Sequence, residues 1–288
     1  MPTRSSAPTS SNSWNARRGG SLRRMHDPYG ASNVLAKPTI EPVANRVWIV
    51  RGGMDYATIP LSMMRGHLPR RPMNIYLIKD HDGVTMFDAG IHAMVEPMRA
   101  ICERMGGLKR VVLGHAHFDH RGVAPHMGVP IICHPDAKAE AEGASEPDYV
   151  DYSKIGPSLP RKAFPRLLKL WDGGPCKIDS TVNEGDDVSG FEVKLFPGHA
   201  PGQIGLWRES DGICLCSDAI YTIDPFTGAF GEPRLPHPFY SQDPHQAQDS
   251  IRKLAALAPT EVWAGHGDPV LGADVVTRLE RAAAAPIP

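Results

Sequence analysis

Three histidines and an aspartate fall within the six residues from His115 to His120, in the pattern H-x-H-x-D-H. A short apolar run, 110–113, comes just before them and is typical of a buried strand. The cluster is therefore expected on a turn at the carboxyl end of a strand, where α/β proteins usually place their chemistry. Imidazole and carboxylate are ligands that zinc and related metals prefer. Because four such side chains on one tight turn would crowd a single ion, the pattern predicts that they serve two ions lying close together.

Further predicted strands also end at turns that carry a histidine or an aspartate. The strands are 85–87, 191–196, 213–216 and 261–264, and the residues that follow them are Asp88, His199, Asp218 and His266. A single histidine after a strand is most often an ordinary surface or core residue. The recurrence of the same arrangement along the chain instead favours one shared site.

The ordered set of motifs resembles the metallo-β-lactamase-fold hydrolase superfamily. The matching motifs are F-D-A-G with Asp88, H-A-H-F-D-H, P-G-H with His199, S-D-A with Asp218 and G-H-G with His266, and they cover residues 45–270. The resemblance implies an α/β fold, the αββα sandwich, with the metals at one edge of the two sheets.

The resemblance also implies two metal sites that share one ligand. His115, His117 and His199 would hold the first metal, Asp119, His120 and His266 the second, and Asp218 would bridge both. Asp88 would support the turn from outside the ligand set and orient a ligand histidine, as metal sites generally require. Two Zn²⁺ per chain are the expected cofactors, with iron or manganese as alternatives.

A pair of adjacent divalent ions predicts hydrolysis. A water that bridges them loses a proton near neutral pH, because the metals stabilise hydroxide. The hydroxide can then attack an ester-like carbonyl that one of the metals polarises. Asp119 would orient this nucleophile and carry a proton to the leaving group. No serine or cysteine nucleophile is needed.

The resemblance narrows the substrate class. True zinc β-lactamases lack the bridging carboxylate that Asp218 supplies, and ribonuclease Z relatives hold tRNA with an arm that has no basic counterpart here. Glyoxalase II enzymes carry a helical C-terminal domain, whereas 22 residues follow His266. N-acyl-homoserine lactonases place a tyrosine three residues beyond the bridging aspartate, and Tyr221 has that spacing. The expected activity is therefore lactonase-like, with the Tyr221 hydroxyl on the substrate carbonyl or oxyanion.

Other functions stay open at this point. A glyoxalase II-like thioesterase without the extra domain is the main alternative, and Tyr221 would then be a packing residue at a strand end. A persulfide dioxygenase with a single iron fits less well, because the second set of ligands is complete. A non-catalytic binding protein is disfavoured for the same reason.

Composition bears on partners and compartment. The formal net charge of −1 gives no reason to expect a polyanionic partner, and no apolar run approaches the ~18 residues of a membrane span. The five cysteines are odd in number and spread out, which fits reduced thiols in a cytoplasmic protein. Cys214 and Cys216 are expected in the core rather than as ligands. The expected partner is a small-molecule substrate, without nucleic acid or membrane, and a homodimer is left open.

One hydrolase domain is expected over residues 36–288, because sandwiches of this size occur as one unit. Residues 1–35 are expected to be a disordered tail; the first 25 hold five arginines and many serines but no acid, a composition shared with organellar transit peptides. Segment 52–72 is either a loop over the metal site or an ordinary hairpin excursion. Insertion 136–190 is expected to form a wall of the substrate cleft. Helices are predicted at 94–105, 162–171, 243–257 and 273–283, and further strands at 45–50 and 74–79.

Overall fold

The computed structural model of the protein describes residues 38–52, 73–143, 147–154, 169, 171–224 and 229–287. The predicted tail 1–35, nearly all of segment 52–72 and most of the predicted helix 162–171 lie outside the described residues. Within the described ranges, no helix has the length and apolar character needed to cross a membrane.

The first sheet contains seven strands in chain order, β1 to β7. They span Thr39–Ala44, Val47–Gly52, Met73–Asp80, Gly83–Phe87, Leu108–Val112, Ile131–Cys133 and Ser180–Thr181. Strands β1 to β4 pair antiparallel, and β4 to β7 run parallel. The carboxyl ends of β4 and β5 therefore lie side by side, and these are the strands that lead into Asp88 and into the histidine-rich turn.

The second sheet contains six strands in the order β15-β14-β11-β10-β9-β8. From β8 to β11 they span Asp187–Val188, Phe191–Leu195, Ile204–Arg208 and Ile213–Ser217, and β14 and β15 span Glu261–Ala264 and Val270–Leu271. A separate hairpin is formed by β12 (Tyr221–Ile223) and β13 (Phe230–Arg234). Strands β11 and β14 are parallel neighbours, so the turns that carry Asp218 and His266 leave the sheet at the same edge.

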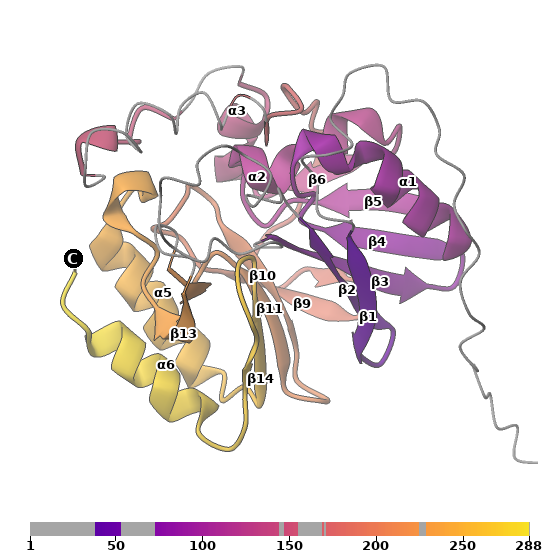
Figure 1. Cartoon of the computed structure of the whole chain (residues 1–288). Helices are drawn as coiled ribbons and strands as arrows, with labels where there is room; N and C mark the ends of the chain where they lie inside the picture. The colour runs from indigo at the N-terminus through magenta and orange to yellow at the C-terminus, as the bar shows by residue number, and fades with distance from the viewer. Residues whose placement is uncertain are drawn as a thin grey trace, which may run out of the picture. The chain divides into compact units, whose positions relative to one another are not determined.

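Helices cover the outer face of each sheet (Figure 1). The α-helices are α1 (Val95–Arg104), α2 (Phe118–Arg121), α3 (Lys138–Ala141), α5 (Pro244–Ala256) and α6 (Val275–Ala284). Short 3₁₀ turns are η3 (His92–Met94), η4 (Ala124–His126), η5 (Pro135–Ala137), η6 (Tyr152–Lys154) and η7 (Pro238–Tyr240). Helices α1 to α3 pack on the first sheet, and α5 and α6 pack on the second. The order of layers is αββα, which confirms the predicted fold.

The strands alternate between two cores. In β3, Ile75 and Leu77 belong to the core under α1, whereas Tyr76 and Ile78 belong to the core between the sheets. A strand buried on both faces must be apolar almost throughout, and β3 has that character. Strand β9 instead buries one face only, so it alternates buried Phe191 and Val193 with polar residues, the period-two pattern seen in the sequence.

Hydrogen bonds join the two sheets beneath the site edge. The Asn74 main-chain N–H donates to the Gly265 carbonyl at 2.9 Å, and its side-chain amide donates to Ala264 and Gly267 at 2.9 Å each. The Tyr76 hydroxyl also donates to Ala264, at 2.5 Å. Asn74 and Tyr76 thereby hold the β14 turn against the first sheet.

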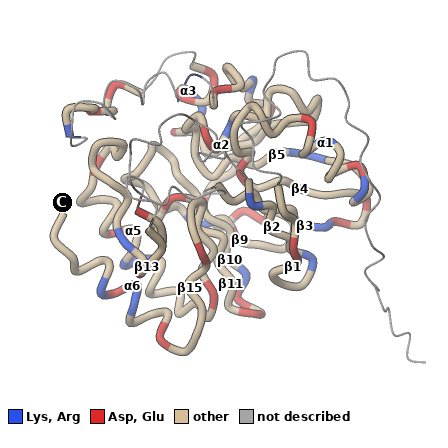
Figure 2. Tube along the Cα trace, viewed as in Figure 1, with Lys and Arg blue, Asp and Glu red and all other residues tan. Residues whose placement is uncertain are grey.

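Along the described trace, acidic and basic residues are interspersed (Figure 2).

Candidate metal centre

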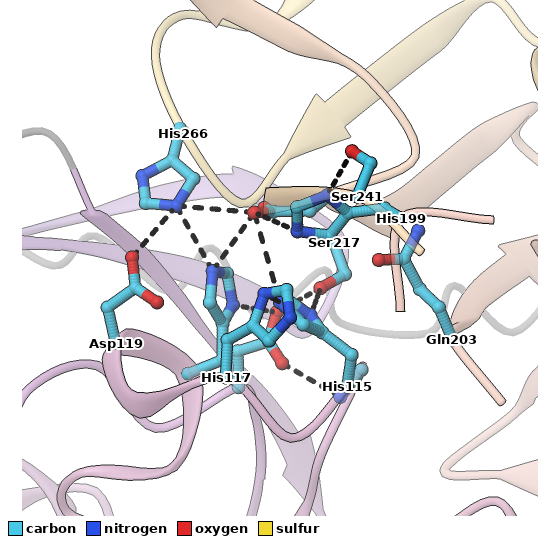
Figure 3. A network of polar contacts seen from close by, with 12 residues as sticks. His115, His117, Asp119, His199, Gln203, Ser217, Ser241 and His266 are labelled. Carbon is cyan, nitrogen blue, oxygen red and sulfur yellow. Dashed lines mark hydrogen bonds and ion pairs between the residues drawn. The ribbon is translucent and has the colours of Figure 1, made fainter. Parts of the chain in front are cut away.

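All seven predicted ligands converge at one edge of the two sheets (Figure 3). They come from the turns that follow β5, β9, β11 and β14: His115, His117, Asp119, His120, His199, Asp218 and His266. Asp88, after β4, lies behind them. Parallel neighbours β4 and β5 in one sheet, and β11 and β14 in the other, bring these turns together.

The first cluster consists of His115, His117 and His199, each of which places a ring nitrogen within 4.8 Å of the others. His115 Nε2 and His117 Nδ1 are 3.0 Å apart. Burial, together with the neighbouring imidazoles, holds the pKa of His115 and of His117 well below the usual value. Burial likewise lowers the pKa of His199 to about 4. The three rings are therefore neutral at pH 7 and offer lone pairs to a cation.

The second cluster consists of Asp119, His120 and His266. His266 Nε2 lies 3.1 Å from His120 Nε2 and 3.3 Å from Asp119 Oδ2. Burial alone would lower the pKa of His120 and His266, but Asp218 and the other carboxylates outweigh it. They raise the pKa of His120 well above its usual value and that of His266 to about 10. The carboxylates therefore favour the protonated form of these rings, and a metal would have to displace that proton.

Asp218 lies between the two clusters. Its Oδ2 is 3.4 Å from the Nε2 atoms of both His120 and His266 and 3.5 Å from Nε2 of His199. The same oxygen is 3.9 Å from His115 Nε2. One carboxylate oxygen thus faces members of both clusters, which is the placement expected of the predicted bridging ligand.

Asp88 holds the ligand turns from behind. Its Oδ1 accepts a hydrogen bond from the Gly114 N–H at 2.8 Å, and its Oδ2 accepts one from the Ser217 hydroxyl at 2.7 Å. Asp88 Oδ2 also lies 3.0 Å from Nδ1 of His120. Asp88 was predicted to orient a ligand histidine, and the histidine beside it is His120. Because both oxygens are already engaged, Asp88 fits an orienting role better than a ligand role.

The crowded turns require particular backbones. A Cβ on Gly114 would lie 2.5 Å from Ser217 Oγ, and one on Gly265 would lie 2.2 Å from Asp218 Oδ1. Asp88 and Ser217 themselves adopt left-handed backbone angles, with φ of 59° and 47°. Such angles are uncommon for residues with a side chain and cluster at functional sites.

Two tyrosines border the clusters. Tyr221 opens β12, and its ring centroid lies 5.2 Å from that of His266 and 5.9 Å from that of His199. Burial and the carboxylates of Asp218 and Asp119 hold the pKa of Tyr221 well above its usual value, so its hydroxyl stays protonated. Tyr240 lies across the first cluster, with its ring 4.3 Å from that of His117. Tyr240 was not predicted from the sequence, where the aromatic run 239–240 is the only local signal.

Cys214 and Cys216 do not join the site. Both are fully buried in the core that the second sheet shares with α5 and α6. This confirms the expectation that they are core residues.

The side chains present fit a metal. His199 Nε2 and Asp218 Oδ1 are buried without a hydrogen-bond partner among the described residues. Asp88 and Asp218 are buried carboxylates, and Asp119 is nearly so, which calls for compensating positive charge close by. Neutral imidazoles and carboxylates around such a point are the donors that zinc, iron and manganese accept.

The chain is similar to several known proteins. A family model described as the metallo-beta-lactamase superfamily matches residues 68–266. A probable metallo-hydrolase of Bacillus subtilis (strain 168), YflN, is 29% identical over 180 residues, which cover 57% of this chain and 66% of that protein. The chain thus spans about two thirds of YflN.

Two further matches are more extensive. An N-acyl homoserine lactonase of Bacillus thuringiensis is 24% identical over 249 residues, covering 74% of this chain and 88% of that protein. Among solved structures, a metallo-beta-lactamase family protein from Thermus thermophilus aligns with a TM-score of 0.55 at 22% identity, over 76% of this chain and 75% of that one. At this identity the structural likeness shows the fold.

Proposed function

The chain belongs to the metallo-beta-lactamase superfamily, and on that premise we propose that it is a metal-dependent hydrolase that binds a pair of zinc ions and opens lactone rings. The proposed ligands are the first cluster for one ion and the second cluster for the other, with Asp218 between them. Divalent ions at these positions would supply Lewis acidity toward a carbonyl oxygen and lower the pKa of a coordinated water.

Asp119 has the position and charge of a proton carrier. Its Oδ2 faces His266 at 3.3 Å, and its side chain is 14% exposed, against 1% for Asp218. Burial would raise its pKa, but His120 and His266 outweigh burial and lower it, so the group is a carboxylate at neutral pH. A carboxylate at the open side of the clusters can hold a proton of the attacking water and pass it to the leaving oxygen.

The observation that carries the lactone proposal is the position of Tyr221. Its ring borders His199 of the first cluster and His266 of the second, and its hydroxyl stays protonated. A protonated phenol at this place can donate a hydrogen bond to a carbonyl oxygen as that oxygen gains negative charge. The alignment with the Bacillus thuringiensis lactonase covers 74% of this chain at 24% identity, and this similarity supports a lactone as the substrate class. A small molecule, rather than a nucleic acid or a membrane, is the proposed partner.

The test compares lactones with thioesters in wild type and Tyr221→Phe, which keeps the ring and removes the hydroxyl. Oxyanion donors are worth ~2.7–4 kcal/mol, and a donor that shares the charge with a metal contributes less. We therefore expect kcat for acyl lactones to fall roughly tenfold or more, with KM changed less than kcat.

Metal content, measured on the same samples, should be equal in wild type and Tyr221→Phe. Wild type should also open acyl lactones faster than it cleaves acyl-glutathione thioesters. Equal lactone turnover by the two proteins, or faster thioester cleavage by wild type, would refute the lactonase proposal.

A further inference from the structure

Each metal-centre histidine has one ring nitrogen that faces the cluster and one, the outer nitrogen, that points away from it. The histidines differ in which group lies next to the outer nitrogen. His115 Nδ1 lies 3.1 Å from the Ser217 hydroxyl, His199 Nδ1 lies 3.2 Å from the Ser241 hydroxyl, and His120 Nδ1 lies 3.0 Å from Asp88. His117 is turned the other way round: its Nδ1 faces His115, and its Nε2 points away from the cluster.

The outer nitrogen of His117 meets a tyrosine and a glutamate in series. His117 Nε2 lies 2.6 Å from the Tyr149 hydroxyl, which lies 3.1 Å and 3.3 Å from the two carboxylate oxygens of Glu140. The Glu140 side chain is 12% exposed, and its Oε1 atom is 3.6 Å from His117 Nε2. All three groups are thus within reach of one another in a mostly buried setting.

Tyr149 and Glu140 both belong to insertion 136–190, not to the sheets that carry the ligands. The stretch of the insertion that carries Glu140 is held by Arg121, which follows His120 and is fully buried. The Arg121 guanidinium donates to the Glu140 carbonyl at 2.7 Å and to the Ala141 carbonyl at 3.0 Å. These bonds tie the ligand turn to the residues around Glu140.

We propose that Tyr149 and Glu140 are positioning residues that fix the tautomer and orientation of His117. A lone pair on Nδ1 requires the proton to sit on Nε2 in the neutral ring. The Nε2–H donates to the Tyr149 oxygen, and the Tyr149 hydroxyl donates in turn to the Glu140 carboxylate. The opposite tautomer would place a proton on Nδ1, the atom that has to offer its lone pair to the metal. The Tyr149 hydroxyl would then donate to Nε2, and the Glu140 carboxylate would lose the donor that it has in the other tautomer.

The consequence is that the insertion sets the metal affinity of the first cluster. Outer partners of ligand histidines typically change metal affinity by about 10- to 100-fold when they are removed. The inference rests on the metal centre alone and holds whichever bond the enzyme cleaves.

The experiment measures Zn²⁺ affinity of the full-length, metal-stripped protein by competition with a chromophoric chelator. Tyr149→Phe should weaken one of the two zinc-binding steps by about 10-fold or more, and Glu140→Gln should weaken the same step by less, because the amide oxygen can still accept from Tyr149. Matched controls are Tyr152→Phe, whose ring packs against the first-sheet core, and Glu142→Gln, whose carboxylate contacts Lys138 and the Ile178 N–H. Both controls should bind zinc as wild type does.

A second readout separates positioning from loss of stability. In ¹⁵N–¹H spectra of the imidazoles, assigned with His117→Gln, wild type should show His117 with its proton on Nε2, and Tyr149→Phe should show a mixture of tautomers. Wild-type zinc affinity and an unchanged His117 tautomer in Tyr149→Phe would overturn the proposal. If Tyr149→Phe does not fold, unchanged zinc affinity in Glu140→Gln would overturn it.

Discussion

Replacement of Asp88 by asparagine tests whether the buried carboxylate behind the ligands holds the metal centre together. Asp88 is fully buried, accepts hydrogen bonds from the Gly114 N–H and the Ser217 hydroxyl, and makes a charge contact with Nδ1 of His120. An asparagine has nearly the same shape, and its carbonyl oxygen can still accept from Gly114. Its NH₂ group, however, cannot accept from the Ser217 hydroxyl, and its neutral side chain removes the charge contact with His120.

The expected magnitude follows from the lost hydrogen bond. A hydrogen bond to a charged group contributes about 1.5–3 kcal/mol, so losing the one from Ser217 sets the scale of the fall in unfolding free energy. Rotation of the Ser217 hydroxyl recovers part of this. Because His120 would lose its orienting partner, we also expect metal affinity at the second cluster to fall by about 10- to 100-fold.

The assay combines chemical unfolding of the metal-free protein with zinc titration. The control is Asp80→Asn, at the far end of β3, where the carboxylate accepts from Thr85 at 2.9 Å and Ser189 at 2.8 Å. The control should lose stability but keep zinc affinity. An Asp88→Asn protein as stable as wild type, or one that binds zinc as tightly as Asp80→Asn does, would show that Asp88 does not hold the metal centre together.

Three further predictions concern the same region. Asp119→Ala should lower kcat by ~10²–10⁴ while the protein stays folded by circular dichroism, because proton transfer is lost; near wild-type turnover would mean that another group moves the proton. Arg121→Met should lower the unfolding free energy by about 2 kcal/mol in urea titration, since the buried Ala141 carbonyl and the partly buried Glu140 carbonyl lose their donor, at about 1–3 kcal/mol for a buried group. Metal loading of the second cluster should release protons at pH 7, because His120 and His266 have raised pKa values and hold protons until the metal displaces them. Calorimetry in buffers of different ionisation enthalpy measures that release, and a buffer-independent heat would contradict it.

The parts of the fold that the sequence predicted are those with strong local signals. Strand β14 spans the predicted residues, 261–264, and β9 and β11 match within one residue. The apolar runs of β11 and β14 and the alternating pattern of β9 each end at a polar turn. The grouping of the predicted ligands was also foreseeable, since strand ends of parallel neighbours meet at one edge. Strands β6, β7 and β8 were not foreseen, because two or three residues show no period and their pairing depends on distant partners.

The outer contacts of the site could not be derived from local pattern. Tyr149 lies 32 residues from His117 in the chain, and Glu140 lies 9 residues from Tyr149, so no motif spacing links them. Their meeting depends on how Arg121 anchors the insertion, which is a tertiary arrangement. The sequence predicted that Asp88 orients a ligand histidine, but it did not identify the histidine. That depends on the pairing of β4 with β5, which places Asp88 beside His120. The predicted role of the insertion as a wall of the substrate cleft stays a prediction.

The central claim, that the two clusters each hold a metal, is tested most directly by elemental analysis of protein purified without chelator. We expect about two divalent ions per chain, because each cluster supplies three donors and Asp218 faces both. We also expect His266→Ala to lower the content to about one. A content near one in wild type, unchanged in His266→Ala, would contradict the binuclear centre.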